Sequence, residues 1–224
     1  MPSPVSDRHD ETRLKLIDAA GEVFAEGGYQ AATVRDICAR AGANVAAINY
    51  HFGDKLGLYT EALKRAVVKA ERPAFEALSA SNDPEQDLRR FLLLMFRQLH
   101  RDDRPAWCTK VMAHELAQPT AALAVVVEHV IRPNSRVLRG IVGRILGLPE
   151  DHCQTRLCVH SVIGQVVHYA HAGPVIALLW PDWKMTPEAV DEIASHVAEF
   201  SLAAMHSIKR KAQLTTPKPT RRSK

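Results

Sequence analysis

Four residues between positions 44 and 49 have side chains that proteins use to recognise bases in DNA. Asn44 and Asn49 carry amides, and an amide can make a bidentate contact with adenine in the major groove. Val45 and Ala46 can contact the methyl group of thymine, and they are small enough to let a helix lie deep in the groove. The segment therefore favours recognition of DNA bases by a short helix.

Side chains that can bind phosphate oxygens lie on both sides of this segment. Tyr50, His51 and Lys55 offer a phenol, an imidazole and an ammonium group. Thr33 precedes a predicted helix whose first backbone amides could hold another phosphate. The charged residues from Thr33 to Lys55 sum to only +1, so affinity should depend more on placement than on charge. The predicted DNA-contacting residues are Thr33, Arg35, Asn44, Val45, Ala46, Asn49, Tyr50, His51 and Lys55.

Two short helices joined by a tight turn would position these residues. Thr33 begins the first as part of a capping box, and Gly42 ends it after about two turns. Asn44 caps the second, which is only about six residues long and too short to be stable alone. The helices that start near residues 10 and 55 must therefore hold it. This arrangement is typical of a helix-turn-helix.

Three runs in this region, Thr33–Ile37, Ala41–Asn44 and Ile48–Tyr59, resemble the signature of TetR-family regulators. Spacing and residue type both agree over three helices. The resemblance implies a homodimer, usually a repressor, that releases double-stranded DNA when a small-molecule effector binds the C-terminal domain. We expect no catalytic activity and no cofactor, since no catalytic or cofactor-binding motif is found.

The resemblance also implies roles for single residues. The backbone amide of Asn44 and the side chains of Tyr50, His51 and Lys55 would hold phosphates, and the residues facing bases would be Val45, Ala46 and Asn49. The family more often has Ser or Thr in place of Asn44, although the capping role is kept. Asn49 is often aromatic in relatives, which leaves the base preference open.

The rest of the chain alternates helical periodicity with short breaks, and we find no pattern typical of strands. Helices are expected over about 84–99, 106–117, 120–146, 151–172 and 186–210, with a kink near Pro133. The sequence thus predicts an all-α protein with about nine helices. We expect a flexible leader over 1–9, a helix-turn-helix domain over 10–56, a helical ligand-binding and dimerisation domain over 57–208, and a basic disordered tail over 209–224.

The net charge of +4 is unevenly distributed along the 224 residues. Seven basic residues and no acidic one lie from Lys209 to Lys224, so the first 208 residues carry a net charge of −3. The folded part should therefore bind DNA through a local patch. The tail is either a solvated charged end or a salt-sensitive arm on DNA.

The C-terminal part is similar to the CecR-type subgroup of TetR regulators around His114–Leu116 and Ile131–Pro133. That similarity names no ligand. We expect a palindromic operator read by two helices about 34 Å apart, with dimerisation through the helices after Gly147. The predicted ligand-binding residues are Met95, Trp107, Met112, Glu115 and Arg132. The predicted dimer interface comprises Val162, Gln165, Val166, Tyr169, Val190, Ile193, Val197 and Phe200.

Alternative functions remain open. Cys153, His160 and His171 fall on one helical face and could make a metal- or redox-responsive regulator, although packed interface residues are the simpler interpretation. A helical interaction module without DNA binding is a further alternative. An enzyme is disfavoured because we find no catalytic motif.

A cytoplasmic location is expected because we find no signal peptide and no Cys-x-x-Cys pair. The stretch 157–181 lacks charged residues but contains several polar ones and is broken at Gly173, so it predicts a packed helix and no membrane partner.

Overall fold

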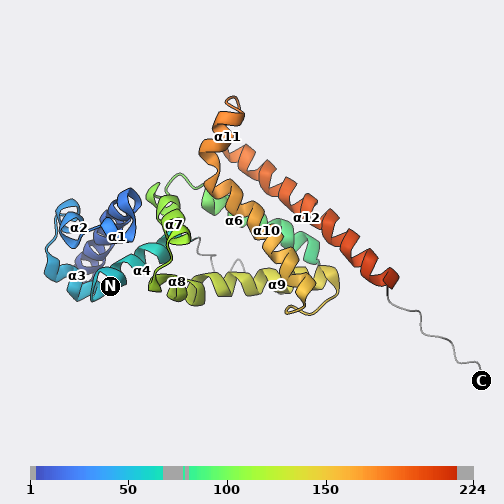
Figure 1. Ribbon diagram of the computed structural model, residues 1–224, viewed down its shortest axis with the longest axis horizontal. Coiled ribbons are helices and arrows are strands. Elements are labelled where there is room, and N and C mark those ends of the chain that lie inside the picture. The colour runs from blue at the N-terminus through green and yellow to red at the C-terminus, as the bar shows by residue number, and fades with distance from the viewer. Residues whose placement is uncertain (1–3, 68–77, 79–80, 216–224) are drawn as a thin grey trace, which may run out of the picture. The chain divides into compact units, whose positions relative to one another are not determined.

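The computed structural model describes residues 4–67, 78 and 81–215, and all regular elements among these residues are helical (Figure 1). The predicted all-α class is thereby confirmed. The chain divides into two compact units. The first unit comprises residues 1–69 and 101–133, and the second comprises residues 70–100 and 134–224.

The first unit packs the helix-turn-helix against two later helices. Its central helices are α1 (Pro4–Ala31), α4 (Lys55–Ala66) and α7 (Trp107–Ala117), joined by α2 (Val34–Ala41), α3 (Val45–Phe52) and α8 (Ala121–Val126). Apolar residues at helical spacing, among them Leu16, Phe24, Ile37, Ile48 and Leu63, form one buried core. The short helices α2 and α3 are thus stabilised by tertiary packing.

A close approach between α1 and α7 depends on Gly21. The indole of Trp107 lies so close to Gly21 that a Cβ on this glycine would stand 2.3 Å from the ring. His114, further along α7, places Nε2 3.3 Å from the carbonyl oxygen of Ala25. Arg104, just before α7, donates to the carbonyl oxygen of Ala66 at 2.8 Å. These contacts join α7 to both α1 and α4.

The second unit is a bundle that includes α6 (Pro84–Leu99), most of α9 (Arg132–Leu146), α10 (Cys153–His171), α11 (Gly173–Leu179) and α12 (Pro187–Thr215). The long helix α12 packs along α6 and against α10. Its core contains Leu88, Phe91, Leu138, Val162 and Val197.

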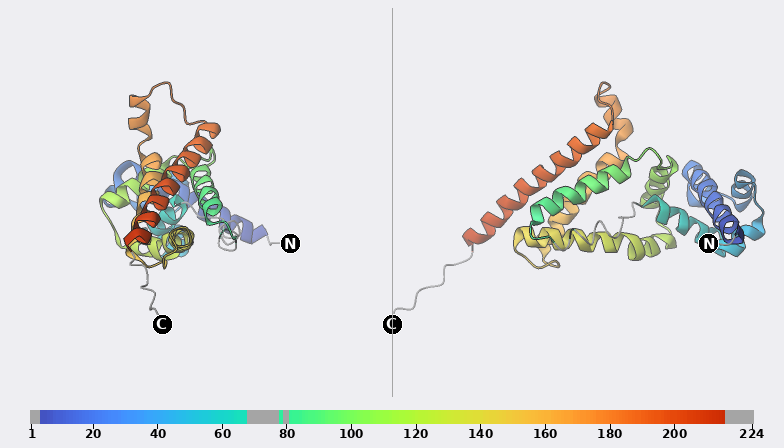
Figure 2. Two further views of the ribbon diagram at one scale, coloured as in Figure 1. Left: turned by 90° about the vertical axis from the view of Figure 1, so that its right-hand side faces the viewer. Right: turned by 180° about the vertical axis from the view of Figure 1, so that it is seen from behind.

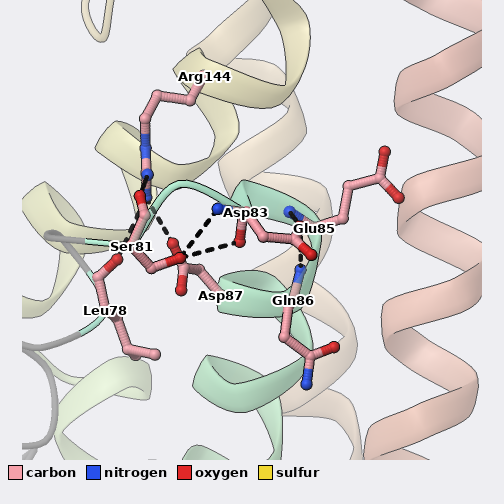
Figure 3. Close-up of polar contacts among 7 residues, drawn as sticks. All are labelled: Leu78, Ser81, Asp83, Glu85, Gln86, Asp87 and Arg144. Carbon is pink, nitrogen blue, oxygen red and sulfur yellow. Dashed lines mark hydrogen bonds and ion pairs between the residues drawn. The ribbon is translucent and has the colours of Figure 1, made fainter.

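A buried ion pair ties the end of α9 to the start of α6. Figure 3 shows Arg144 donating to the carboxylate of Asp87, which is fully buried, at 2.8 Å. The same guanidinium donates to the carbonyl oxygens of Ser81 at 2.7 Å and Leu78 at 3.2 Å. Asp83 caps α6 through the backbone amides of Glu85 and Gln86, as the Asp-Pro sequence predicts.

The long helix expected over 120–146 is divided by a π-helical turn. The turn spans Val127–Ile131, between α8 and α9. Pro133 lies two residues after the turn, and its missing N–H cannot bond to the carbonyl four residues earlier. The backbone widens before the proline, so the predicted irregularity lies one turn earlier than expected.

Both ends of the chain are more helical than predicted. Helix α1 begins at Pro4, inside the expected leader, because proline is favoured in a first turn. Helix α12 continues to Thr215, through the first seven residues of the expected tail, where Lys209, Arg210 and Lys211 are good helix formers. The rest of the predicted tail, 216–224, lies outside the described residues.

Candidate nucleic-acid interface

The turn between α2 and α3 is built by side-chain caps at each helix start. The hydroxyl of Thr33 accepts from the amide of Asp36 at 3.2 Å and donates to the carboxylate of the same residue at 2.6 Å. Gly42 ends α2 with a φ of 62°, a left-handed conformation that glycine adopts without strain. Asn44 then caps α3 by accepting from the amide of Ala47 at 2.9 Å. The predicted caps are confirmed.

Helix α3 has one buried side and one exposed side. Ile48 is fully buried in the core of the first unit. The opposite side is exposed and carries the predicted base-reading residues and one predicted phosphate ligand: Asn44, Val45, Ala46, Asn49 and Tyr50. Positions 45, 46, 49 and 50 share a face because a helix repeats every 3.6 residues. These side chains can therefore enter a groove together.

The end of α3 contains the predicted phosphate ligands in an aromatic cluster. Tyr50 is 75% exposed, and its ring centroid lies 5.1 Å from that of the half-buried His51. The guanidinium of Arg13 lies 5.5 Å from the ring centroid of Phe52. Phe52 is thus held from the α1 side, while Tyr50 extends outward.

Lys55 has a structural role that the sequence did not indicate. Its ammonium donates to the carbonyl oxygens of Tyr29 at 2.8 Å and Ala32 at 2.9 Å, and it lies 4.4 Å from the ring centroid of Tyr29. Regular helix geometry in α1 breaks at Gly28, where φ is 72°. The break leaves carbonyl groups near the helix end that need donors. That glycine is the only sequence signal that could have suggested the role.

Two other basic residues of the region differ in their surroundings. Arg35 is exposed at the start of α2, as is Thr33. Arg40 instead forms ion pairs with Glu26 at 2.7 Å and Glu22 at 3.6 Å. The hydrogen bond from Arg40 lowers the pKa of Glu26. Of Arg35, Arg40 and Lys55, only Arg40 is paired with carboxylates of the described residues. Arg35 and Lys55 are therefore better placed to bind a phosphate.

An ion-pair cluster joins α1 to α4. Glu61 pairs with Arg13 of α1 and, at 2.8 Å, with Lys64 of its own helix. Burial raises the pKa of Glu61, but hydrogen bonds and charge from Lys64 and Arg13 outweigh it, so the pKa lies below its ordinary value. The carboxylate is therefore ionised at neutral pH and helps to orient the two helices.

Glu115 is buried inside the first unit and is satisfied by protein groups. Its carboxylate accepts from the backbone amide of Thr120 at 2.8 Å and from the hydroxyl of Thr120 at 3.1 Å. Burial, and then the nearby Glu115, raise the pKa of Tyr59. The carboxylate thus joins α4, α7 and the start of α8.

The predicted ligand-binding residues are distributed over both units. Trp107 lies in the core of the first unit and Met112 packs beside that core, whereas Met95 packs against the core of the second unit. Arg132 is exposed and pairs with Glu128 at 2.7 Å. A cavity of about 160 Å³ in the first unit is lined by none of the five, but by Gly28, Tyr29, Gln30, Tyr59, His114, Gln118, Pro119 and Thr120. The five-residue ligand site therefore stays a prediction.

The predicted dimer residues are mostly inside the protomer. Five of the eight are at most 4% exposed and belong to the core of the second unit, namely Val162, Val166, Val190, Ile193 and Val197. Gln165 and Tyr169 are half-buried, and Phe200 is 61% exposed. The apolar stripes were correctly identified, but they pack α10 and α12 onto their own bundle. A dimer interface on α10 and α12 stays a prediction, and among the eight residues Phe200 is the most exposed to a second copy.

The predicted metal-responsive set does not come together. Among the described residues no three His, Cys, Asp or Glu side chains converge to hold a metal ion. Cys153 and His171 are separated by about 27 Å along α10, at 1.5 Å per residue. A redox response of the exposed Cys153 stays a prediction.

The length and apolar composition of the helices bear on whether any of them could cross a membrane. Among the described residues no single helix is long and apolar enough to cross a bilayer. Helices α10 and α11 reach that length and apolar composition only when taken together, and their axes are bent by 74°.

Comparison with known families matches both parts of the chain. The sequence model described as "Bacterial regulatory proteins, tetR family" matches residues 16–62. The model described as "HTH-type transcriptional dual regulator CecR, C-terminal domain" matches residues 84–205. The HTH-type transcriptional dual regulator CecR of Shigella flexneri is 31% identical over 195 residues, which are 82% of this chain and 86% of that protein.

Solved structures share the fold at lower identity. A mutant of the regulator HlyIIR superimposes with a TM-score of 0.61 and 23% identity, covering 84% of this chain and 97% of that chain. The transcriptional regulator FadR from Bacillus subtilis, in complex with stearoyl-CoA, gives a TM-score of 0.61 at 19% identity, covering 85% and 97%.

Proposed function

We propose that this chain, which belongs to the tetR family of bacterial regulatory proteins and carries a CecR-type C-terminal domain, binds a palindromic DNA operator as a homodimer. A small-molecule effector releases it from that operator. It acts in the cytoplasm, where bacterial DNA lies. Relatives bear names of repressors, an activator and a dual regulator. We propose repression as the effect when the operator overlaps a promoter.

The exposed face of α3 is the observation that carries this proposal. It presents two amides, a small apolar pair and a phenol on one short helix that is fixed by a buried isoleucine. Asn44, Val45, Ala46 and Asn49 contact base edges in the major groove. Tyr50, His51, Lys55 and the start of α2, with Thr33 and Arg35, contact phosphates.

Dimerisation follows from the size of the reading helix. An α3 of eight residues reads too few base pairs to select one site in a genome. Two copies related by a two-fold axis read two half-sites one helical turn apart. A palindromic operator is the DNA counterpart of that symmetry.

The outward faces of α10 and α12 are the best surface for the second copy. We call this surface the free face. On α10 the residues at positions 157, 160, 164 and 167 are exposed and uncharged, and on α12 so are those at 196, 200 and 203. A Cβ on Gly164 would have open space around it, so another helix can approach closely there. The free-face residues are Leu157, His160, Gly164, Val167, His196, Phe200 and Ala203.

An effector can act by moving the whole first unit. FadR binds stearoyl-CoA in its solved complex, and we propose that this chain also binds a small molecule. The chain passes between its two units at residues 69–70, 100–101 and 133–134. Because α7 and α8 pack with the helix-turn-helix, a shift at these crossings carries the α3 helices of the two protomers out of register on the operator.

The test begins by finding the operator. Duplexes with a randomised central region are selected on the full-length protein, and the recovered sequences are measured by fluorescence anisotropy. We expect a two-fold symmetric consensus, and binding that falls at least about 100-fold when one half-site is scrambled. Equal affinity for the consensus and for random duplex would refute the proposal.

The effector is tested on the same operator. Anisotropy is repeated with a panel of small molecules that includes free fatty acids, acyl-CoA thioesters and uncharged aromatic compounds. Operator affinity that no compound changes, at concentrations up to the solubility limit, would argue against effector release and leave the DNA-binding proposal standing.

A further inference from the structure

A projecting apolar segment follows α10. We call residues 173–185 the α11 arm. It extends beyond the ends of α10 and α12 in both views of the second unit (Figure 2). Leu178 is 83% exposed, Leu179 61% and Trp180 57%, and Val175 and Met185 are exposed as well. Several large apolar side chains on one short segment form a patch of the kind that marks an interaction site.

The arm is attached to its own protomer at few points. Helix α11 follows α10 after Ala172 alone, and its axis is bent by 74° from that of α10. Ile176 is its one buried large side chain among residues 173–185. The ring of Trp183 lies 6.5 Å from that of Tyr169 and 6.4 Å from that of Trp180. The base of the arm is thus fixed, while Leu178, Leu179 and Trp180 face outward.

We infer that the arm docks on a second copy of this chain and extends the dimer interface beyond the free face of α10 and α12. This inference rests on the proposed dimer. The arm is continuous with the free face, because Val167 is exposed on the last turns of α10. Residue 173 lies about 13 Å from Gly164 along the chain at 1.5 Å per residue. An arm that turns away at that distance can reach around a partner packed at Gly164.

The composition of the free face also favours a second copy of this chain as the partner of the arm. Its only large apolar side chains are Leu157, Val167 and Phe200, and the others are histidines or small residues. Stable homodimers bury large interfaces with an apolar centre. The leucines and tryptophans of the arm add aromatic and aliphatic anchors to the three that the free face provides.

A lipid surface is the competing occupant, since tryptophans and leucines also enter membrane interfaces. Helix α11 has seven residues, so it can contact a bilayer but cannot span one. No basic residue of the arm other than Lys184 would attract anionic lipid, and Asp182 offsets it. Charge therefore gives no preference for a membrane, and continuity with the free face favours the second copy.

The experiment compares full-length proteins by sedimentation equilibrium. In the test variant Leu178→Ser is combined with Trp180→Ser. In the control Leu116→Ser alters an apolar side chain of α7 that is also exposed. We expect the dimer dissociation constant to rise at least about tenfold in the test variant, because buried aromatic anchors dominate interfaces, and to stay unchanged in the control. Circular dichroism should show equal helicity in all three proteins.

A second readout follows the tryptophans of the wild-type protein. Trp107 is buried in the first unit, so quenching by iodide reports mainly on Trp180 and Trp183. We expect quenching to be weaker above the dimer dissociation constant than below it. Quenching that does not change with protein concentration would place the arm outside the interface.

The remaining outcomes separate the arm from the dimer itself. If the wild-type protein is monomeric at all concentrations, the proposed function fails together with the arm. If test variant and wild type dimerise equally tightly, the arm inference fails and the proposed function stands. Equal dimerisation with loss of binding to phosphatidylcholine–phosphatidylglycerol vesicles in the variant would assign the arm to lipid. A wild-type tetramer that the variant reduces to a dimer would assign it to contacts between dimers.

Discussion

At the scale of single residues, the exposed side of α3 separates base recognition from phosphate binding. Asn49 and Val45 lie on the exposed face of α3, where the backbone N–H groups that the helix leaves without an internal partner are confined to the first turn and suit a phosphate. Specificity must come from their side chains. Tyr50 and His51 lie near the end of α3, and Lys55 begins α4. Contacts from these residues to phosphates can fix the register of α3 on the duplex but cannot distinguish one base from another.

Asn49→Ala should weaken binding to the selected operator at least about tenfold, since a bidentate amide contact is worth about 1–3 kcal/mol. Binding to random duplex should not change, because the phosphate contacts remain. Fluorescence anisotropy with both duplexes measures the ratio. The matched control is Gln118→Ala, which removes an exposed amide from the end of α7. An unchanged ratio in Asn49→Ala would remove Asn49 from base recognition.

Lys55→Met should lower both stability and DNA affinity. The variant leaves the carbonyl groups of Tyr29 and Ala32 without their donor, which should cost about 2 kcal/mol of the free energy of unfolding. The ammonium has a third N–H for a phosphate, so the slope of log affinity against log salt should fall by about one.

Urea unfolding and salt titration measure the two roles of Lys55 separately. Lys110→Met, which removes an exposed lysine of α7, is the control. A stability loss with an unchanged salt slope would show that Lys55 positions the turn and does not touch DNA.

At the scale of elements, the orientation of α1 against α4 depends on charge. The folded state lowers the pKa of Glu61, so its contribution to stability is present above the ordinary value of 4.5 and is lost as pH falls through the folded value. Glu61→Gln should therefore destabilise the protein by about 1 kcal/mol or less at pH 7 and low salt. The difference should shrink as pH falls through the folded pKa of Glu61.

Urea denaturation at pH 7 and pH 3 tests this dependence. The comparison variant is Glu22→Gln, which removes a more exposed carboxylate 3.6 Å from Arg40 and should have a smaller effect at pH 7. A Glu61→Gln penalty that is the same at both pH values would mean that packing, and not charge, explains it.

Removing either partner of the ion pair between α6 and α9 should destabilise the protein, but by different amounts. Arg144→Met leaves Asp87 fully buried without a cation, which should cost about 3 kcal/mol or more. Asp87→Asn should cost less, about 1–2 kcal/mol, since its amide oxygen can still accept from Arg144. Thermal unfolding of the two variants compares them. A larger loss for Asp87→Asn would contradict the burial of the carboxylate.

At the scale of the whole molecule, the prediction concerns assembly. Phe200→Glu places a charge on the free face and should raise the dimer dissociation constant at least about 100-fold, because an unpaired charge in an interface is costly. Operator affinity should fall with it. Ser195→Glu is the control, since Ser195 is exposed on the same helix but about 140° around it. Sedimentation equilibrium measures the dimer dissociation constant of both variants, and fluorescence anisotropy measures their operator affinity. Dimers of equal strength in the two variants would exclude the free face.

The sequence by itself determined most of the helices, their caps and the helix-turn-helix, but not α11 or the π-helical turn at Val127–Ile131. Thr33, Gly42, Asn44 and Asp54 act through neighbours only a few residues away, so local chemistry fixes their roles. Helical periodicity likewise identified the apolar stripes of α10 and α12.

Only the tertiary structure decided what those stripes contact. A stripe that can pack in a core can also pack in an interface, because both bury apolar area in the same way. The pairing of Lys55 with Ala32 and of Trp107 with Gly21 joins residues far apart in sequence, where no periodicity links them. Burial of Glu115 and exposure of the α11 arm depend in the same way on how the helices pack around them.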